Sequence, residues 1–313
     1  MLKKASRAAI AVGIAGISSV TMAENCSTVR FSDIGWTGTI TTTAIATEVL
    51  QGLGYKTKTQ LLSLPVTYMS MANGDIDVFL GNWMPSMTSD IAPYIKAGTV
   101  EDLGPNLKGT RFTLAVSKAA YDAGITDFSD LAKHRKEFAG RIYGLEPGND
   151  GNRLVQDMID KNAFDLGDFQ LVESSEVGML SQVNRSIRQH QWIAFLGWDP
   201  HPMNSSLAMD YLSGGDEYFG AHYGSATVHT NVRKGYTQSC PNVGRFLKNL
   251  TFSMSMENQI MAKMFDEDKQ PNVAVKEWLI TNPDVLNTWL NGVKTESGGN
   301  GLMAVKAHLG LKK

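Results

Sequence analysis

A short apolar run that ends in glycine, tryptophan and proline occurs twice in this sequence. The first copy is Leu-Gly-Asn-Trp-Met-Pro at residues 80–85, and the second is Phe-Leu-Gly-Trp-Asp-Pro at residues 195–200. Such a run predicts a strand that delivers its tryptophan onto a turn, where ligand-facing residues commonly lie. A third, looser copy at residues 31–36 also ends in tryptophan. A single tryptophan is more often a core residue, but the repetition predicts two walls that face each other across a ligand.

The first 23 residues have the pattern of a secretory signal peptide. Three basic residues precede an apolar run at residues 8–20, and the small-residue end Thr-Met-Ala follows at 21–23. The run is too short to span a membrane, so we expect an exported, soluble mature chain. Its removal takes three of the 29 basic residues and none of the 31 acidic ones. The modest negative charge that remains, without a basic arm or patch, argues against a nucleic-acid partner.

The sequence contains only two cysteines, Cys26 and Cys240. In an oxidising compartment such a pair most simply forms one disulfide, which in the chain-entropy model contributes about 4 kcal/mol or more for so long a loop. Neither cysteine belongs to a CxxC motif or has a histidine at ligand spacing, which argues against a metal or redox role. We therefore expect a structural disulfide.

Predicted strands and helices alternate along the chain, which indicates two α/β units. The first unit has expected strands at 29–34, 56–62 and 76–80 with helices at 37–50 and 66–72. After a polar connector, the second has strands at 111–116, 141–145, 169–172 and 192–196 with helices at 128–136, 152–161 and 177–189. A strand at 226–232 and helices at 243–264, 273–280, 283–290 and 302–309 complete the chain.

The disulfide would return the helical tail to the first unit. We therefore expect one lobe made of residues 24–110 and 226–313 and a second, inserted lobe made of residues 111–225. Two hinge segments, near residues 110 and 226, would join them.

The glycine-rich loop at 146–152, Glu-Pro-Gly-Asn-Asp-Gly-Asn, precedes a predicted helix. Its backbone amides could hold a small anion or a hydroxyl group at the helix N-terminus. An ordinary helix cap by Asn149 or Asp150 explains the loop equally well. No Lys-Ser/Thr follows, so the loop is not a nucleotide-binding motif.

The search for catalytic or metal-binding chemistry is mostly negative. The mature chain has no HExxH or GxSxG motif. His201 and His229 lie near predicted strand ends, where a structural role is the commoner one. The methionines between 254 and 264 fall at helical spacings, which core packing explains. We expect no metal and no cofactor.

Six stretches of the chain resemble the substrate-binding proteins of quaternary-amine ABC transporters, which take choline, glycine betaine or carnitine. The stretches lie at residues 31–36, 65–69, 77–85, 142–153, 195–203 and 226–233. The resemblance spans essentially the whole mature chain. It implies a periplasmic binding protein of the type II-like, two-lobed α/β class, and a monomer that contacts the membrane only through a partner permease.

In that family an aromatic box surrounds a trimethylammonium group. The resemblance places Trp36, Trp83 and Trp198 in three walls of the box and Phe112 in the fourth, where the choline-binding members have tyrosine. It further matches Asn149 to a ligand-binding Asn of the family and the Cys26–Cys240 pair to a family disulfide. We add Gly38, where this chain departs from the family, and His201 as candidate ligand-binding residues.

Elementary physics supports the same function. A quaternary ammonium has no N–H to donate, but the negative faces of several rings attract it, each by roughly 0.5 to 2 kcal/mol when desolvated. Rings from two lobes would close on the ligand by a hinge motion. The rival functions are an exported enzyme acting on a choline ester, which would need an activated nucleophile, and a chemoreceptor sensing module, which would need a membrane segment after the signal peptide. The sequence offers neither feature.

One departure from the family suggests which ligand is bound. In the choline-binding members, Thr-Asp follows the first box tryptophan, whereas here Gly38 stands in place of that Asp. Losing this carboxylate would remove a like charge from the surroundings of a ligand carboxylate, and Phe112 lacks a hydroxyl suited to choline. We therefore expect a zwitterionic ligand, with carnitine ahead of glycine betaine and choline third.

Overall fold

One mixed β-sheet runs through the whole molecule in the order β2-β1-β3-β9-β4-β7-β5-β6, with β8 paired to β4. The computed structural model describes residues 26–311, so the expected signal peptide lies outside the described residues. The strands are β1 (Thr28–Asp33), β2 (Lys56–Leu61), β3 (Val78–Met84), β4 (Val100–Ser117), β5 (Arg141–Tyr143), β6 (Gln170–Val172), β7 (Ala194–Asp199), β8 (Met209–Tyr211) and β9 (Ser225–Arg233).

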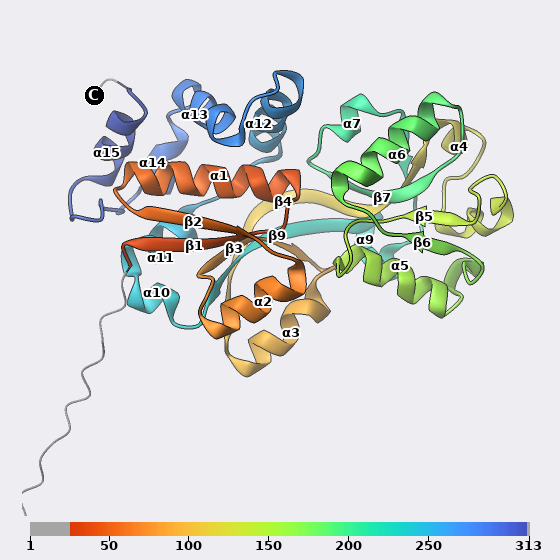
Figure 1. The fold of residues 1–313 in the computed structure, drawn as a ribbon, viewed down its shortest axis with the longest axis horizontal. Coiled ribbons are helices and arrows are strands. Elements are labelled where there is room, and N and C mark those ends of the chain that lie inside the picture. Colours follow the sequence, from red (N-terminus) through yellow and green to blue (C-terminus); the bar gives the residue numbers. More distant parts are fainter. Residues whose placement is uncertain (1–25, 312–313) are drawn as a thin grey trace, which may run out of the picture.

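The helices cover this sheet in two groups, which gives the molecule two lobes (Figure 1). They are α1 (Thr37–Gly52), α2 (Leu64–Asn73), α3 (Thr88–Ala97), α4 (Lys118–Asp122), α5 (Asp150–Asp160), α6 (Glu176–Arg188), α7 (Met203–Ser206), α8 (Asp216–Phe219), α9 (Ala221–Gly224), α10 (Tyr236–Ser239), α11 (Pro241–Asn249), α12 (Met254–Asp266), α13 (Pro271–Thr281), α14 (Val285–Trp289) and α15 (Gly301–His308). Three short 3-10 helices are η1 (Phe128–Asp130), η2 (Ala132–His134) and η3 (Ala163–Asp165).

Two long antiparallel strands, β4 and β9, connect the lobes (Figure 1). The polar connector expected before residue 111 is wrong, because β4 already begins at Val100. Its pairing with β9 shifts register three times between Asp102 and Thr110, and such bulges break the alternation of apolar and polar residues by which a strand is recognised. The expected lobe boundaries, at residues 110 and 226, fall within β4 and at the start of β9 and stay a prediction.

The first lobe is built on the parallel strands β2, β1 and β3, as the βαβ alternation predicts. Helix α1 lies on one face of them and packs against α12, α13 and α15, while α2 and α3 cover the other face (Figure 1). The expected single helix at 243–264 is two helices, α11 and α12. They separate because the Ser253 hydroxyl accepts a hydrogen bond from Met256 N and starts α12 afresh.

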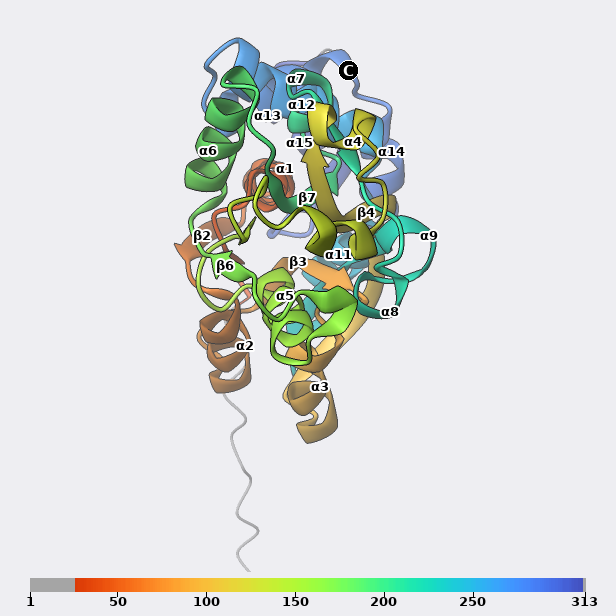
Figure 2. The same ribbon diagram turned by 90° about the vertical axis from the view of Figure 1, so that its right-hand side faces the viewer.

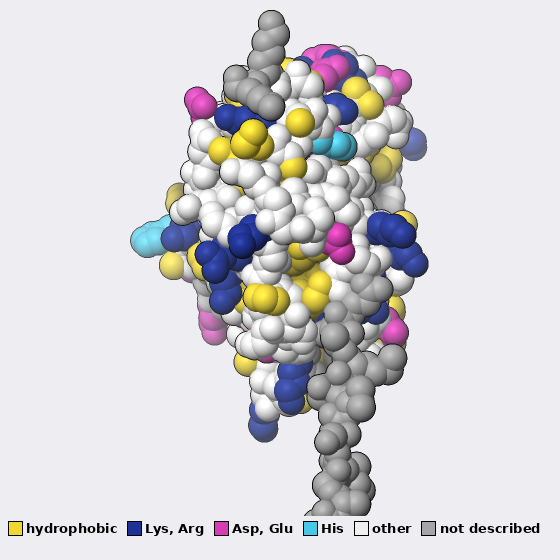
Figure 3. Space-filling model, turned by 90° about the vertical axis from the view of Figure 1, so that its left-hand side faces the viewer, with side chains coloured by type: hydrophobic (Ala, Val, Ile, Leu, Met, Phe, Trp, Pro, Cys, Tyr) yellow, Lys and Arg dark blue, Asp and Glu magenta, His cyan; other side chains and the backbone are white. Residues whose placement is uncertain are grey.

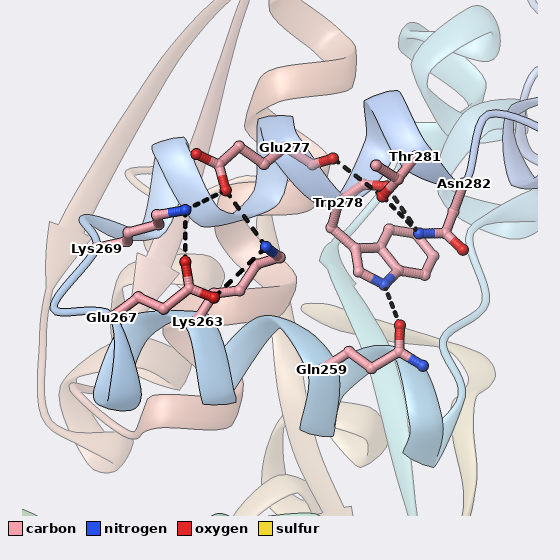
Figure 4. Close-up of polar contacts among 8 residues, drawn as sticks. All are labelled: Gln259, Lys263, Glu267, Lys269, Glu277, Trp278, Thr281 and Asn282. Atoms are coloured by element: carbon pink, nitrogen blue, oxygen red, sulfur yellow. Dashed lines mark hydrogen bonds and ion pairs between the residues drawn. The ribbon is translucent and has the colours of Figure 1, made fainter.

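Helix α12 is fixed to α13 by side-chain contacts (Figure 4). The indole Nε1 of Trp278 donates to Gln259 Oε1 at 2.8 Å. About one turn further along α12, Lys263 bridges to Glu277, and Lys269 does so from the loop before α13. The position of α12 over α1 is therefore well defined, and so is that of Glu257, which α12 carries.

The second lobe combines the far half of β4 with β7, β5 and β6, and α5 and α6 lie on opposite sides of these strands (Figures 1 and 2). Its apolar core contains residues between Phe112 and Phe219 and is separate from the two apolar clusters of the first lobe. The helix expected at 128–136 is only the two short helices η1 and η2. The Asp127 and Asp130 carboxylates cap this segment in a capping box, which fixes a tight turn there.

The outer end of the first lobe carries small groups of Lys and Arg side chains separated by uncharged and apolar surface (Figure 3). Between residues 26 and 311, no helix is long and apolar enough to cross a membrane.

The predicted disulfide joins Cys26 to Cys240, with a Cα–Cα distance of 5.6 Å. Both cysteines pack on the core of the first lobe, so the bond ties β1 to the start of the helical tail.

We predict that Cys26→Ser lowers the melting temperature and leaves affinity for trimethylammonium ligands within a few fold. Opening the bond returns chain entropy to the unfolded state, which in the chain-entropy model lowers stability by about 4 kcal/mol. The affinity should change little, because the bond lies within one lobe. Thermal unfolding and calorimetry measure the two effects. The double variant Cys26→Ser/Cys240→Ser controls for the free thiol, and a large loss of affinity in a folded variant would contradict the prediction.

Candidate functional site

Four aromatic rings surround a small cavity between the lobes. They belong to Trp36 and Trp83 of the first lobe and to Phe112 and Trp198 of the second. The remaining lining residues are Gly38, Thr39, Leu145 and Asp150. The structure thus brings together five of the seven predicted site residues, and it places Asn149 and His201 outside the lining.

The tryptophans occupy different structural positions from those expected. Trp83 and Trp198 lie within strands β3 and β7, near their ends, and not on the turns that follow. Trp83 pairs with Val228, and Trp198 stands directly opposite Phe112 in the antiparallel ladder. Trp36, by contrast, lies beyond β1, as the pattern predicts, and is the residue immediately before α1.

Each ring is held by neighbours, so the cavity wall is rigid. Trp83 packs against the apolar clusters of both lobes, and its ring centroid lies 6.1 Å from that of Phe112. Phe112 in turn meets Phe219 edge to face at 5.7 Å. The ring of Trp198 meets His201 in the same way at 5.0 Å. Contacts of this kind fix the direction in which each ring face points.

The backbone of α5 approaches Phe112 so closely that only glycine fits at residue 151. A Cβ atom there would lie 2.5 Å from Phe112 Cζ. Gly151 is the second residue of α5, so this contact brings the N-terminus of the helix against the aromatic wall. The preceding residue, Asp150, consequently lines the cavity.

Asp150 is the unexpected member of the site. It is 1% exposed, and neither carboxylate oxygen has a partner in hydrogen-bond geometry among the described residues. Burial raises its pKa to about 7; the neighbouring Ser86 hydroxyl and Arg153 oppose this shift, and Asp90 adds to it. Burying a carboxylate with so little compensation is costly, and a cation in the cavity would offset that cost.

The glycine-rich loop caps α5. Asn149 Oδ1 accepts hydrogen bonds from Gly151 N at 2.8 Å and Asn152 N at 3.2 Å. Asn152 is also fully engaged, since its amide bonds to the backbone of Leu145 and Glu146. Of the two interpretations of this loop, the structure favours the cap over an anion site, because the amides of Gly151 and Asn152 already bond to Asn149.

The N-terminus of α1 receives its cap from the other lobe. Helix α1 has no side-chain cap of its own and no acidic residue in its first turn. Glu176, at the start of α6, accepts hydrogen bonds from Thr37 N at 3.1 Å and from the Thr37 hydroxyl. A carboxylate at this position satisfies unpaired amide groups and opposes the helix dipole.

His201 supports this contact. Its Nδ1 accepts a hydrogen bond from Met203 N, so its Nε2 carries the proton and donates to Glu176 Oε1 at 3.1 Å. The histidine, which is 3% exposed, therefore both orients Glu176 and packs against Trp198. It acts on the cavity through these two residues.

Two further contacts join the lobes around the cavity. Trp36 Nε1 donates to the carboxylate of Glu146 at 3.0 and 3.1 Å. Arg153 donates to Asp90 and to the Ser86 carbonyl, both at 2.8 Å. Burial raises the pKa of Glu146, so the surroundings of Trp36 are desolvated as well as acidic.

The sequence offered few signals for the acidic residues. Asp150 was considered only as a helix cap, and Glu176 stands just before a predicted helix, where acidic residues are common. Glu146 belongs to the loop that the resemblance singled out. A carboxylate that caps a helix of another lobe has no sequence signature, because the partner is distant along the chain.

The arrangement is suited to binding a cation. No group of His, Cys, Asp and Glu in residues 26–311 could hold a metal ion. The cavity lining contains neither histidine, serine nor cysteine. Aromatic faces and one buried carboxylate are the groups that recognise a large, weakly hydrated cation.

Comparison with known proteins gives a consistent result. A family model described as the substrate binding domain of ABC-type glycine betaine transport systems matches residues 27–281. The structure of an ABC-transporter choline-binding protein in complex with choline is similar to this one with a TM-score of 0.90 and 56% sequence identity, covering 91% of this chain and 98% of that chain.

More distant relatives share the architecture. Lactococcal OpuAC, in its closed form with glycine betaine, is similar with a TM-score of 0.75 and 26% identity, covering 84% of this chain and 98% of that chain. The glycine betaine/carnitine transport binding protein GbuC of Listeria monocytogenes is 27% identical over 190 residues, which is 60% of this chain and 60% of that protein.

We predict that Glu176→Ala opens the molecule. The change leaves Thr37 N and the His201 Nε2–H without their acceptor, which should cost about 1 to 3 kcal/mol, and it removes a contact between the lobes. The expected result is a lower melting temperature together with a larger radius of gyration in small-angle scattering.

The control for this prediction is Glu173→Ala. Glu173 accepts a hydrogen bond from Asn152 within the second lobe, so its loss should not change the radius of gyration. If Glu176→Ala keeps the dimensions of the unaltered protein, the contact does not hold the lobes together.

Proposed function

The chain belongs to the family of substrate-binding domains of ABC-type glycine betaine transport systems, and we propose that it binds the trimethylammonium head of its ligand in the cavity between the lobes. It is a transport binding protein and not an enzyme. The two-lobed α/β fold predicted from the sequence is confirmed by the structural relatives. The observation that carries the proposal is the set of four rings, two from each lobe, around one cavity.

The rings account for recognition of the head group. Each methyl-covered face of a quaternary ammonium can meet one ring, at roughly 0.5 to 2 kcal/mol per desolvated contact. Because the rings come from both lobes, the cage is complete only when the lobes are closed. Ligand and closure are therefore coupled, and the closed shape is the signal that a transporter can read.

Asp150 supplies the charge that the rings lack. Its carboxylate lies in the cavity wall without a partner, so a bound cation would compensate a charge that is otherwise costly to bury. We propose that Asp150 is a ligand-binding residue beside Trp36, Trp83, Phe112 and Trp198. Asn149 and His201 act indirectly, the first through the cap of α5 and the second through Glu176 and Trp198.

The expected preference for carnitine assumes that no carboxyl group lies near residue 38, but Glu257 supplies one. Gly38 itself carries no charge, but the carboxyl group of Glu257 reaches the same place from α12, with Oε2 only 3.6 Å from where a Cβ of residue 38 would stand. With Asp150, the cavity and its surroundings hold two buried carboxyl groups. A zwitterion would bring its own carboxylate into this region, so we propose choline ahead of glycine betaine and carnitine.

The setting of the protein follows from its family. As the binding protein of an ABC importer, it works outside the cytoplasm. We propose that it is periplasmic, exported by its N-terminal leader, and that as a monomer it presents both lobes to a membrane permease. Residues 24–110 and 226–313 would form one lobe and residues 111–225 the other, with hinges in β4 and at the start of β9.

We predict that Trp83→Leu and Trp198→Leu each weaken choline binding at least about tenfold. Leucine keeps apolar volume, which is needed because both residues are strand residues packed on a core and alanine would leave a destabilising cavity, but it offers no ring face. Calorimetry on purified protein with choline, glycine betaine, carnitine, proline betaine and acetylcholine measures the effect.

Trp192→Leu is the matched control. Trp192 packs on His134 and Phe138 in the second lobe, away from the cavity lining, and its replacement should leave every affinity unchanged. If the unaltered protein binds none of the five compounds, the proposed function is wrong.

We predict that choline affinity rises with pH through about 7. The pKa of Asp150 is raised, so below pH 7 the carboxyl is protonated and a bound cation must displace the proton. The apparent affinity should then fall by up to about tenfold per unit of decreasing pH, and the decrease should be much smaller in Asp150→Asn.

The stability of the ligand-free protein should change with pH in the opposite direction. Its stability should fall as pH rises from about 4 to 7, because a raised carboxyl pKa favours the folded state at low pH.

A further inference from the structure

A second, small cavity adjoins the aromatic box on the side of the first lobe. The two cavities share three lining residues, Gly38, Thr39 and Trp83. Because residue 38 has no side chain, none stands between the two spaces at this point. A ligand tail that left the box at Gly38 would meet the carboxyl group of Glu257, whose Oε2 lies 3.6 Å from where a Cβ atom of residue 38 would stand.

The second cavity contains one ionisable side chain, that of Glu257. The residue is 3% exposed, and Oε1 has no hydrogen-bond partner among the described residues. Burial raises its pKa to about 8. Buried carboxyl groups almost always have partners, so an unpaired one that lines a cavity indicates a ligand group that is absent from this structure.

The carboxyl group is held in place by its helix. The Ser253 hydroxyl caps α12, and Gln259 anchors α12 to Trp278 of α13 (Figure 4). Both contacts lie within one turn of Glu257. The residue thus reaches the cavity from a fixed helix, which is how binding groups are kept in register with a ligand.

We propose that the second cavity is a subsite for the hydroxyl-bearing tail of a quaternary-ammonium alcohol, and that Glu257 accepts the hydrogen bond of that hydroxyl. The inference rests on the proposed function, because it requires the ammonium head to lie in the aromatic box. It gives a specificity role to a residue of the C-terminal helices, far along the chain from the box residues.

The chemistry favours a hydroxyl over a carboxylate in this subsite. A hydroxyl can donate to the carboxylate form of Glu257 and can also bond to its acid form, so it suits both protonation states. A ligand carboxylate can bond only to the acid form, which the raised pKa of Glu257 favours at neutral pH, and it is repelled once Glu257 ionises. Among the other lining residues, Leu80, Leu107 and Val228 are apolar, and the hydroxyls of Thr39 and Thr42 are neutral donors that do not offset this repulsion as a cation would.

The test compares choline with tetramethylammonium, which has the same head and no tail. Glu257→Met keeps the length of the side chain and removes its polar end. We expect it to weaken choline binding about tenfold or more and to leave tetramethylammonium binding within about twofold. We also expect a higher melting temperature, since an unpaired buried carboxyl is removed. If Glu257→Met does not fold, Glu257→Gln should show a smaller loss, again confined to choline.

Glu48→Met is the matched control. Glu48 is a buried glutamate of α1 that pairs with His308 at 3.0 Å. Its replacement should lower the melting temperature and change neither affinity.

The outcomes separate this inference from the proposed function. If the unaltered protein binds neither compound, the aromatic box itself is wrong. If it binds both and Glu257→Met changes the two affinities equally, or changes neither, the subsite is wrong. A loss that is larger for glycine betaine than for choline would assign Glu257 to a carboxylate and overturn the hydroxyl assignment.

Discussion

The contact on which the closed structure depends is the capping of α1 by a residue of the other lobe. A helix N-terminus with no cap of its own has unpaired amides and a partial positive charge, and here Glu176 satisfies both needs from across the cleft. The same end of α1 carries Trp36 immediately before it and Gly38 within its first turn. Closing the lobes therefore supplies the N-terminal cap of α1 and encloses the cavity. The same movement brings Glu146 to Trp36, whose indole it orients. Because His201 links Glu176 to Trp198, the cap also couples the two walls of the box.

The electrostatics of the cleft follow from the same closure. Bringing the lobes together removes water from carboxyl groups beside the cavity, and the pKa values of Glu146 and Asp150 are both raised, mainly by burial. These groups lie around a space lined by rings and able to hold a cation, which offsets part of their desolvation cost. A ligand without a positive charge would leave that cost in place. Selection for a cation is thus a property of the closed form as a whole, with the rings fixing the shape of the head group and the carboxyls fixing its charge.

Much of this site could be predicted because its aromatic residues are local features of the sequence. Trp36, Trp83 and Trp198 follow glycine and apolar runs, and the parallel strands of the first lobe follow from the alternation of elements. The carboxyls could not be predicted in the same way. Asp150 begins a helix, where an acidic residue is ordinary, and Glu257 lies among methionines that indicate core packing. These carboxyls stand out because they are buried and lack hydrogen-bond partners. That can be recognised only once the positions of all neighbouring residues are known. Of the long strand β4, the sequence predicts only residues 111–116, since bulges in the preceding part interrupt the apolar alternation that identifies a strand.

The positions of the two strand tryptophans explain how a cage can be both rigid and able to open. Trp83 and Trp198 are held by ladder pairing and by core contacts, so neither ring needs to move relative to its own strand. Phe112 stands opposite Trp198 on β4, and β4 also pairs with β9, the other strand that passes between the lobes. A small change of twist in these two strands would carry Phe112 and Trp198 as a unit away from Trp36 and Trp83. The bulges of β4 between Asp102 and Thr110 lie at the first-lobe end of this connection, where interrupted pairing makes such a change of twist least costly.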